Sequence, residues 1–279
     1  MYYEYFDVHS HLNFPQFDAD REDYIELMRT ERIGTITVGT NLVTSRSAVD
    51  LAQRYEHLFS TIGIHPHDVK DSHNDIESLY DLAKNNRVVA VGECGLDYFR
   101  FKESDHGSLE VRKAQKILFE EHIDIAHTHM LPLMIHARPS GGSMDAYEDI
   151  LEILVNTKHQ APNIKVRGNV HFFAGTVDIA RRFLDLGFSL SFDGPITFTS
   201  EYDEVIRYIP DDRIMSETDS PFAAPAPFRG KRCDPTMVRF VVQRIAEIRG
   251  EKQEIMAERL VKNAITVFGL SNFLEMNSS

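Results

Sequence analysis

Short apolar segments with high β-propensity recur along the whole chain, and helical patterns separate them. Eight such segments are predicted strands, at residues 5–9, 34–40, 59–65, 88–93, 132–136, 168–172, 188–192 and 213–217. Strands that alternate with helices indicate parallel strands joined by helical crossovers, and eight of them indicate a closed (β/α)8 TIM barrel, an α/β fold. Segments such as ITVGT and VVAVGE are continuous apolar runs, which is typical of strands buried on both faces.

The segments between these strands supply the helices that such a barrel needs. Helices are predicted at residues 20–32, 109–130, 145–156, 177–186, 235–249 and 253–268, from apolar residues at helical spacing. The chain has 279 residues, and barrels of this kind take about 250 residues as one unit. We therefore expect residues 1–279 to form one barrel domain.

Hydropathy and cysteine content indicate which cellular compartment to expect for this protein. No run of 18 apolar residues occurs, so we expect no membrane span. The first residues, MYYEYFDVHSHL, lack a basic segment followed by an apolar one, and they are predicted to be a first strand rather than a signal peptide. The two cysteines, Cys94 and Cys233, give no disulfide framework, which favours a cytoplasmic location.

The net charge of -13 argues against a broad basic surface that grips duplex DNA. It leaves a nucleic-acid substrate open, because bound metals and a few local arginines can supply positive charge where a phosphate sits.

Four histidines and two carboxylates lie at or just after the ends of predicted strands. They are His9 and His11 at strand one, Glu93 at strand four, His136 at strand five, His171 at strand six and Asp219 after strand eight. In a TIM barrel these ends form the active-site face. One such histidine is more often structural, but independent accident would scatter six residues over both ends of the barrel. Their joint placement favours a metal site.

The residue types and their number indicate which metal chemistry to expect. In Asp7-Val-His9-Ser-His11, alternation in an extended segment places both imidazoles on one face, although this motif alone is only moderately specific. Imidazole and carboxylate ligands suit Zn, Mn, Mg or a similar divalent ion. Six ligands exceed what one catalytic zinc with an open position needs. They suit two divalent metal ions about 3.5–4 Å apart.

Two of these ligands have expected roles in catalysis. Glu93 is the natural bridge, because its carboxylate has two oxygens and comes from a middle strand. No lysine ends strand four or five, so a bridge made by a modified lysine is disfavoured. Asp219 can bind one metal and also accept a proton from an attacking water whose pKa the metals lower.

With these residues in place, the chain resembles the TatD family of metal-dependent deoxyribonucleases, within the amidohydrolase-like barrels. The resemblance runs nearly end to end, through DVHSH (7–11), GIHPHD (63–68), GECGLDY (92–98), LPLMIHAR (131–138), HFFAG (171–175), ETDSPFAAPAPFRGKR (217–232) and NAITVFGL (263–270). It departs from many members at Phe172, where they have Cys, and at Cys233-Asp234-Pro235, where they have Asn-Glu-Pro. Neither departure removes an expected ligand.

The resemblance implies a division of the ligands between two ions. It implies that His9, His11, Glu93 and Asp219 serve one metal, and that Glu93 with His136 and His171 serves the other. It also implies hydrolysis of phosphodiester bonds in DNA, often from an end.

Two polar residues beside the expected centre allow more than one interpretation. His65 follows strand three and either contacts a substrate phosphate or a metal-bound water, or makes a structural hydrogen bond. Asp97 either orients a metal-binding imidazole, as carboxylates commonly do, or is a turn residue.

Three cations are the expected phosphate-binding residues. Arg138 lies two residues beyond His136 on the same strand and can pair with a phosphate. Arg229 and Lys231 belong to the dense basic segment RGKR (229–232) that follows Asp219. A solvated loop is the alternative, but its place beside the expected site favours phosphate binding.

The leading functional hypothesis is a phosphodiesterase that cleaves DNA at ends or single strands with a water activated by two metals. The alternative is an amidohydrolase-type enzyme that cleaves a C–N or ester bond, for example on aminoacyl-tRNA, because fold does not fix function. The RGKR segment favours phosphate. A metal-stabilised scaffold is a third possibility, which six ligands on the functional face disfavour.

Overall fold

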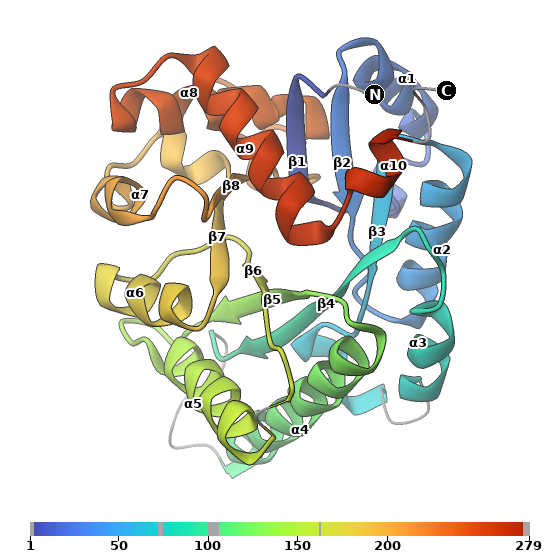
Figure 1. Cartoon of the computed structure of the whole chain (residues 1–279), viewed down its shortest axis with the longest axis vertical. Helices are drawn as coiled ribbons and strands as arrows, with labels where there is room; N and C mark the ends of the chain where they lie inside the picture. Colours follow the sequence, from blue (N-terminus) through green and yellow to red (C-terminus); the bar gives the residue numbers. More distant parts are fainter. Residues whose placement is uncertain (1–2, 72–74, 100–105, 162, 276–279) are drawn as a thin grey trace.

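The computed structural model describes residues 3–71, 75–99, 106–161 and 163–275 (Figure 1). Eight strands pair in parallel in sequence order. They are β1 (Tyr5–Ser10), β2 (Ile33–Thr37), β3 (Leu58–Ile62), β4 (Val88–Asp97), β5 (Leu133–Arg138), β6 (Gly168–Val170), β7 (Phe188–Phe192) and β8 (Ile214–Ser216).

The first and last strands meet through the segment that follows β8. Ser10 and Ser220 form a parallel bridge there. The Asp219 N–H donates to the His9 carbonyl at 2.9 Å, and the His11 N–H donates to the Ser220 carbonyl at 2.7 Å. The eight strands thus form a nearly closed barrel, which confirms the predicted (β/α)8 fold.

Helices follow the strands around the outside of the barrel (Figure 1). They are α1 (Arg21–Thr30), α2 (Leu42–Arg54), α3 (Ile76–Leu82), α4 (His106–His129), α5 (Asp145–Gln160), α6 (Val177–Asp185), α7 (Asp203–Tyr208), α8 (Val238–Arg249), α9 (Gln253–Phe268) and α10 (Ser271–Glu275). Short 3-10 turns are η1 (Pro15–Phe17), η2 (Pro66–Asp71), η3 (Gly194–Thr197) and η4 (Pro235–Met237). In the described part of the chain, no helix combines the length and the apolarity that a membrane crossing needs.

Helix α2 is absent from the sequence-based expectations. Its first turn, Leu-Val-Thr-Ser, consists largely of residues with modest helix propensity. A capping box starts the helix instead: the Asn41 side chain accepts from the Thr44 N–H, and the Thr44 hydroxyl accepts from the Asn41 N–H. Conversely, the helix expected from residue 235 begins as the turn η4, capped by Asp234, and becomes α-helical at Val238.

Strand β4 is longer than expected, and this changes the placement of Glu93. All ten of its residues are buried, and it runs to Asp97 instead of ending at Glu93. Its ladder with β5 is irregular between Val91 and Cys94, and inside this irregularity the Glu93 N–H donates to the Gly39 carbonyl at 2.8 Å. Strand β5 likewise continues two residues past His136. The prediction that these two residues end their strands was therefore wrong.

Two clusters of buried apolar side chains stabilise the barrel. One lies between strands and surrounding helices, and it includes Phe183 and Val241. The other includes Phe6, Phe59 and Met215 of the strands together with residues of α9. Burying one such side chain stabilises a fold by about 1.5–3 kcal/mol. These cores give the polar side chains at the C-terminal strand ends a rigid support.

Candidate metal centre

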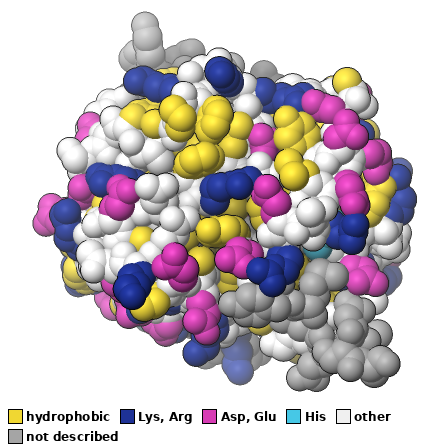
Figure 2. Space-filling model, turned by 90° about the horizontal axis from the view of Figure 1, so that it is seen from above, with side chains coloured by type: hydrophobic (Ala, Val, Ile, Leu, Met, Phe, Trp, Pro, Cys, Tyr) yellow, Lys and Arg dark blue, Asp and Glu magenta, His cyan; other side chains and the backbone are white. Residues whose placement is uncertain are grey.

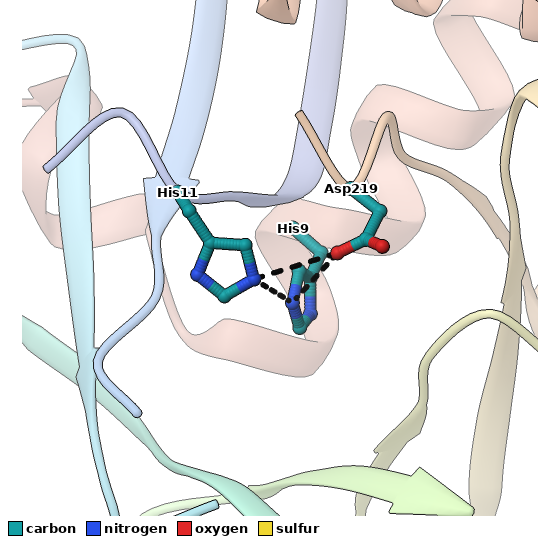
Figure 3. Close-up of side chains that lie close together, drawn as sticks. All are labelled: His9, His11 and Asp219. Atoms are coloured by element: carbon teal, nitrogen blue, oxygen red, sulfur yellow. Dashed lines mark hydrogen bonds and ion pairs between the residues drawn. The ribbon is translucent and has the colours of Figure 1, made fainter. Parts of the chain in front are cut away.

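His9, His11 and Asp219 come together where β1 meets the segment after β8 (Figure 3). His9 Nε2 lies 3.2 Å from His11 Nε2. Asp219 Oδ1 lies 3.6 Å from His9 Nε2 and 3.4 Å from His11 Nε2. Asp219 has a φ of 53°, a left-handed conformation that Asp tolerates better than most residues. These three side chains point at one shared position.

Glu93 adds a fourth atom to this group. Its Oε2 lies 3.6 Å from His9 Nε2 and 3.7 Å from His11 Nε2. Four ligands placed tetrahedrally at the usual Zn–N distance of about 2.0–2.1 Å are about 3.3–3.4 Å apart. Five of the six separations within this set of four, from 3.2 to 3.7 Å, lie near this spacing. The donor types and their spacing therefore fit a divalent ion.

The other carboxylate oxygen of Glu93 faces a second pair of histidines. Glu93 Oε1 lies 2.8 Å from His136 Nδ1 and 2.8 Å from His171 Nε2, and these two nitrogens are 3.3 Å apart. The first two distances are those of direct hydrogen bonds, so this group is more tightly closed than the first. The rings of His9 and His171 stack with centroids 3.8 Å apart, which places the two groups side by side.

Burial and neighbouring charged groups determine the ionisation states of Glu93 and His171. Burial acts to raise the pKa of Glu93, but His171 and the hydrogen bond with His136 outweigh burial and hold that pKa well below its usual range. Burial acts to lower the pKa of His171, yet Glu93 and Glu217 hold it well above its usual value. Glu93 is therefore a carboxylate, ready to bind cations through both oxygens.

The outer nitrogens of two of these histidines, His11 and His136, lie within hydrogen-bond distance of acceptors. His11 Nδ1 lies 3.2 Å from the Val38 carbonyl. His136 Nε2 lies 3.1 Å from Asp97 Oδ2, which favours the orienting role over the alternative that Asp97 is a turn residue. Such contacts fix the ring orientation and the tautomer of a metal-binding histidine.

Glu217 is a residue that the sequence analysis did not identify. It is fully buried, and its Oε1 lies 3.5 Å from His171 Nδ1. It also accepts from the Phe172 N–H and the Ser191 hydroxyl, both at 2.5 Å. A carboxylate immediately after a buried strand, two residues before Asp219, is the sequence signal that could have identified Glu217.

Asp7 connects β1 to the segment that carries Asp219. Its Oδ1 accepts from the His9 N–H at 3.1 Å and the Thr218 N–H at 3.0 Å, and its Oδ2 accepts from the Thr218 hydroxyl at 2.6 Å. The aspartate that begins the DVHSH motif therefore positions His9 and Asp219 relative to each other.

His65 belongs to the same cluster. Its Nε2 lies 3.7 Å from Glu93 Oε1, and its ring packs edge-on against His136 with centroids 4.4 Å apart. Burial and the neighbouring His136 lower the pKa of His65 to about 3, so this imidazole is neutral. His67 lies beside it, with Nε2 3.1 Å from Asp97 Oδ2.

The three predicted phosphate-binding cations lie outside this cluster. Arg138 and Arg229 are exposed, and their guanidinium groups stack on Phe99 at 3.9 Å and Phe198 at 4.4 Å. Lys231 is exposed near Phe228.

Arg232, the last residue of the basic segment, is already paired. It donates to Asp20 Oδ2 and to the Gln16 carbonyl, both at 2.5 Å. The basic segment 229–232 therefore offers fewer cations for binding phosphate than the sequence indicated.

Nearly the whole chain matches a known family. The model of the TatD related DNase family matches residues 6–269. The chain is 36% identical over 270 residues to an uncharacterized metal-dependent hydrolase, YabD, of Bacillus subtilis, covering 95% of this chain and 99% of that protein. It is 30% identical over 275 residues to the 3'-5' ssDNA/RNA exonuclease TatD of Pantoea ananatis, covering 95% and 99%.

A solved structure agrees. The crystal structure of YjjV, a TatD homolog from Escherichia coli, superposes with a TM-score of 0.82 at 27% identity and covers 95% of this chain and 98% of its own. The chain thus belongs to the TatD-related DNase family and is a metal-dependent hydrolase of that family.

Proposed function

We propose that this protein is a phosphodiesterase that cleaves nucleic acid at ends or single strands, DNA above all, using two divalent ions. One observation carries the proposal. Glu93 presents Oε2 to His9 and His11 and Oε1 to the His136–His171 pair. One carboxylate shared by two adjacent ligand groups is the arrangement that a two-metal hydrolase needs.

Each ligand residue then has a defined task. Divalent ions bound by these residues would lower the pKa of a water toward neutrality and would stabilise charge on a phosphoryl oxygen. Glu93 holds the two ligand groups at a fixed separation. Asp219 has a side chain that is 14% exposed, the largest value among the first group of four, so its carboxylate faces the open side of the site. Asp219 is positioned to accept the proton that the attacking water releases.

The cations at the rim support a phosphate-containing substrate. Arg138, Arg229 and Lys231 are exposed beside the mouth, and we assign them and His65 to binding substrate phosphates. On the face drawn in Figure 2, basic and acidic side chains are interspersed. A protein with few phosphate contacts should bind with a shallow salt dependence, which favours short ends over long duplexes.

The relatives add independent support for this substrate class. Proteins similar to this chain are named 3'-5' ssDNA/RNA exonucleases. The two free cysteines are buried, which agrees with a reducing compartment, and we propose a cytoplasmic location.

The test is a substrate comparison with the metal-loaded protein. End-labelled single-stranded DNA, duplex DNA and RNA are incubated beside a panel of carboxyl esters and amides, including aminoacyl-tRNA. We expect progressive shortening of single-stranded DNA from an end. Turnover of an ester or amide with no cleavage of nucleic acid would replace this proposal with the amidohydrolase alternative.

A further inference from the structure

Three exposed phenylalanines lie on the side of the barrel where the strands end, which is its mouth. Phe99 is 53% exposed, Phe198 is 41% exposed and Phe222 is 48% exposed. They follow β4, the turn η3 after β7, and β8, so all three lie in segments beyond C-terminal strand ends. Large aromatic rings left in water beside a polar site commonly mark a ligand-binding surface.

Phe222 is directly connected to the first ligand group. Its N–H donates to the Asp219 carbonyl at 2.9 Å, and its ring centroid lies 6.2 Å from that of His11. Phe14 stacks on His11 with centroids 4.4 Å apart and lies edge-on to Phe222 at 6.4 Å. An aromatic surface therefore leads outward from the ring of His11 and ends in a half-exposed phenyl face.

Phe99 has the equivalent position beside the second ligand group. Its N–H donates to Asp97 Oδ1 at 3.1 Å, while Asp97 Oδ2 contacts His136. The guanidinium of Arg138 lies 3.9 Å from the ring of Phe99. The guanidinium of Arg229 lies over the ring of Phe198 in the same way, at 4.4 Å.

An aromatic ring next to a cation, as at Phe99 and Phe198, matches the chemistry of a nucleotide, and Phe222 offers a ring beside His11. A base stacks on the ring, and the adjoining phosphate pairs with the cation. We propose that Phe222 and Phe99 are stacking sites for unpaired nucleobases on the two sides of the scissile phosphate. This inference rests on the proposed function and defines its substrate class as single-stranded nucleic acid, because a base inside a duplex has both faces covered.

The test couples removal of a ring to removal of a base. Binding is measured by fluorescence anisotropy on the metal-loaded protein, with a labelled hexathymidylate whose phosphorothioate linkages resist cleavage. Matched probes lack one base at each position in turn. Phe222→Ala should weaken binding of the intact probe by about tenfold. The same substitution should have little effect on the probe that lacks the base stacked on Phe222, because that probe has already lost the contact between base and ring.

Three variants complete the design. Phe222→Tyr keeps an aromatic face and should restore binding, whereas Phe99→Ala should couple to a base at a different position. Tyr208→Ala removes an exposed ring at the end of α7, away from the mouth, and should change nothing. Metal content and circular dichroism establish that each variant is folded and loaded.

The outcomes separate this inference from the proposed function. Equal weakening of the intact and all abasic probes by Phe222→Ala, unchanged binding, or no binding to the wild-type protein would overturn the stacking sites. Coupled binding without cleavage of ordinary phosphodiester DNA would contradict the proposed function and leave the stacking sites standing.

Discussion

Asp97 holds the imidazole of His136 from the side opposite the candidate metal position. Asp97 Oδ2 lies 3.1 Å from His136 Nε2, while the Nδ1 atom of the same ring faces Glu93 Oε1 at 2.8 Å. A carboxylate on one nitrogen places the proton there and leaves the other nitrogen free to bind a cation.

Asp97→Ala should weaken the second metal position selectively. Without its carboxylate partner, the His136 ring can rotate and change tautomer, and metal affinity should fall about 10–100-fold there. Stepwise chelation followed by elemental analysis measures both ions per chain. Asp178→Ala, which removes only an exposed ion pair with Arg181, is the control and should retain both ions. Equal loss of both ions in Asp97→Ala would contradict a positioning role for Asp97.

Glu93→Ala should release metal from both groups. Both groups lose their shared carboxylate, and the two positive charges then repel each other without it. Activity should fall by several orders of magnitude. Glu93→Gln should be intermediate in metal content, because an amide offers one neutral oxygen. The barrel fold should survive in both variants, as circular dichroism would show. Two ions per chain and normal turnover in Glu93→Ala would show that Glu93 is not the bridge.

Metal removal should abolish hydrolysis reversibly. Dialysis against a chelator leaves four histidines and two carboxylates without the cations that their spacing fits. Adding back Zn, Mn, Co or Mg should restore activity to different degrees, because imidazole and carboxylate ligands discriminate among these ions. The thermal midpoint should also rise on metal addition, because binding to the native state stabilises it. Full activity of protein shown to contain no metal would contradict this mechanism.

Arg229→Ala and Lys231→Ala should raise KM for DNA more than they lower kcat. Both cations are exposed in the segment that follows β8, and they should bind phosphate equally in the ground and transition states. Arg232→Ala is the matched control within the same segment, since its guanidinium is already paired with Asp20. Steady-state kinetics on single-stranded DNA provides the comparison. An unchanged KM in the first two variants would remove this loop from the substrate site.

His122 should make stability depend on pH. Burial lowers the pKa of His122 from 6.5 to about 4. Its Nε2 accepts from the Ile64 N–H at 2.9 Å, and its Nδ1–H donates to the Leu118 carbonyl at 2.7 Å, so the native state requires the neutral ring. The unfolded chain takes up a proton below pH 6.5 while the native state does not, so stability declines as pH falls from 6.5 toward 4.

The size of this effect follows from the difference between the two pKa values. Between pH 7 and pH 5, His122 should account for about 2 kcal/mol of lost unfolding free energy. Urea unfolding of metal-free wild type and His122→Gln at both pH values measures it, and the variant should show the smaller decline. His159→Gln, at an exposed position on α5, should behave like the wild type. Identical declines in wild type and His122→Gln would contradict the assignment.

The sequence by itself determined the barrel and the six residues at its mouth. Hydrophobic runs such as residues 88–93 can be buried on both faces only in a covered parallel sheet, and eight of them allow a closed one. Motifs such as DVHSH carry their geometry in short-range alternation, so the pairing of His9 with His11 followed from spacing alone.

The tertiary structure decided which groups pair across strands. Asp7 with Thr218 and His171 with Glu217 are separated by 211 and 46 residues, and no local periodicity relates such positions. The tertiary structure also decided that Arg232 forms an ion pair with Asp20, whereas Arg229 stacks on Phe198. Adjacent loop cations look equivalent in sequence. They differ because only the folded chain determines which acidic or aromatic side chain lies within reach.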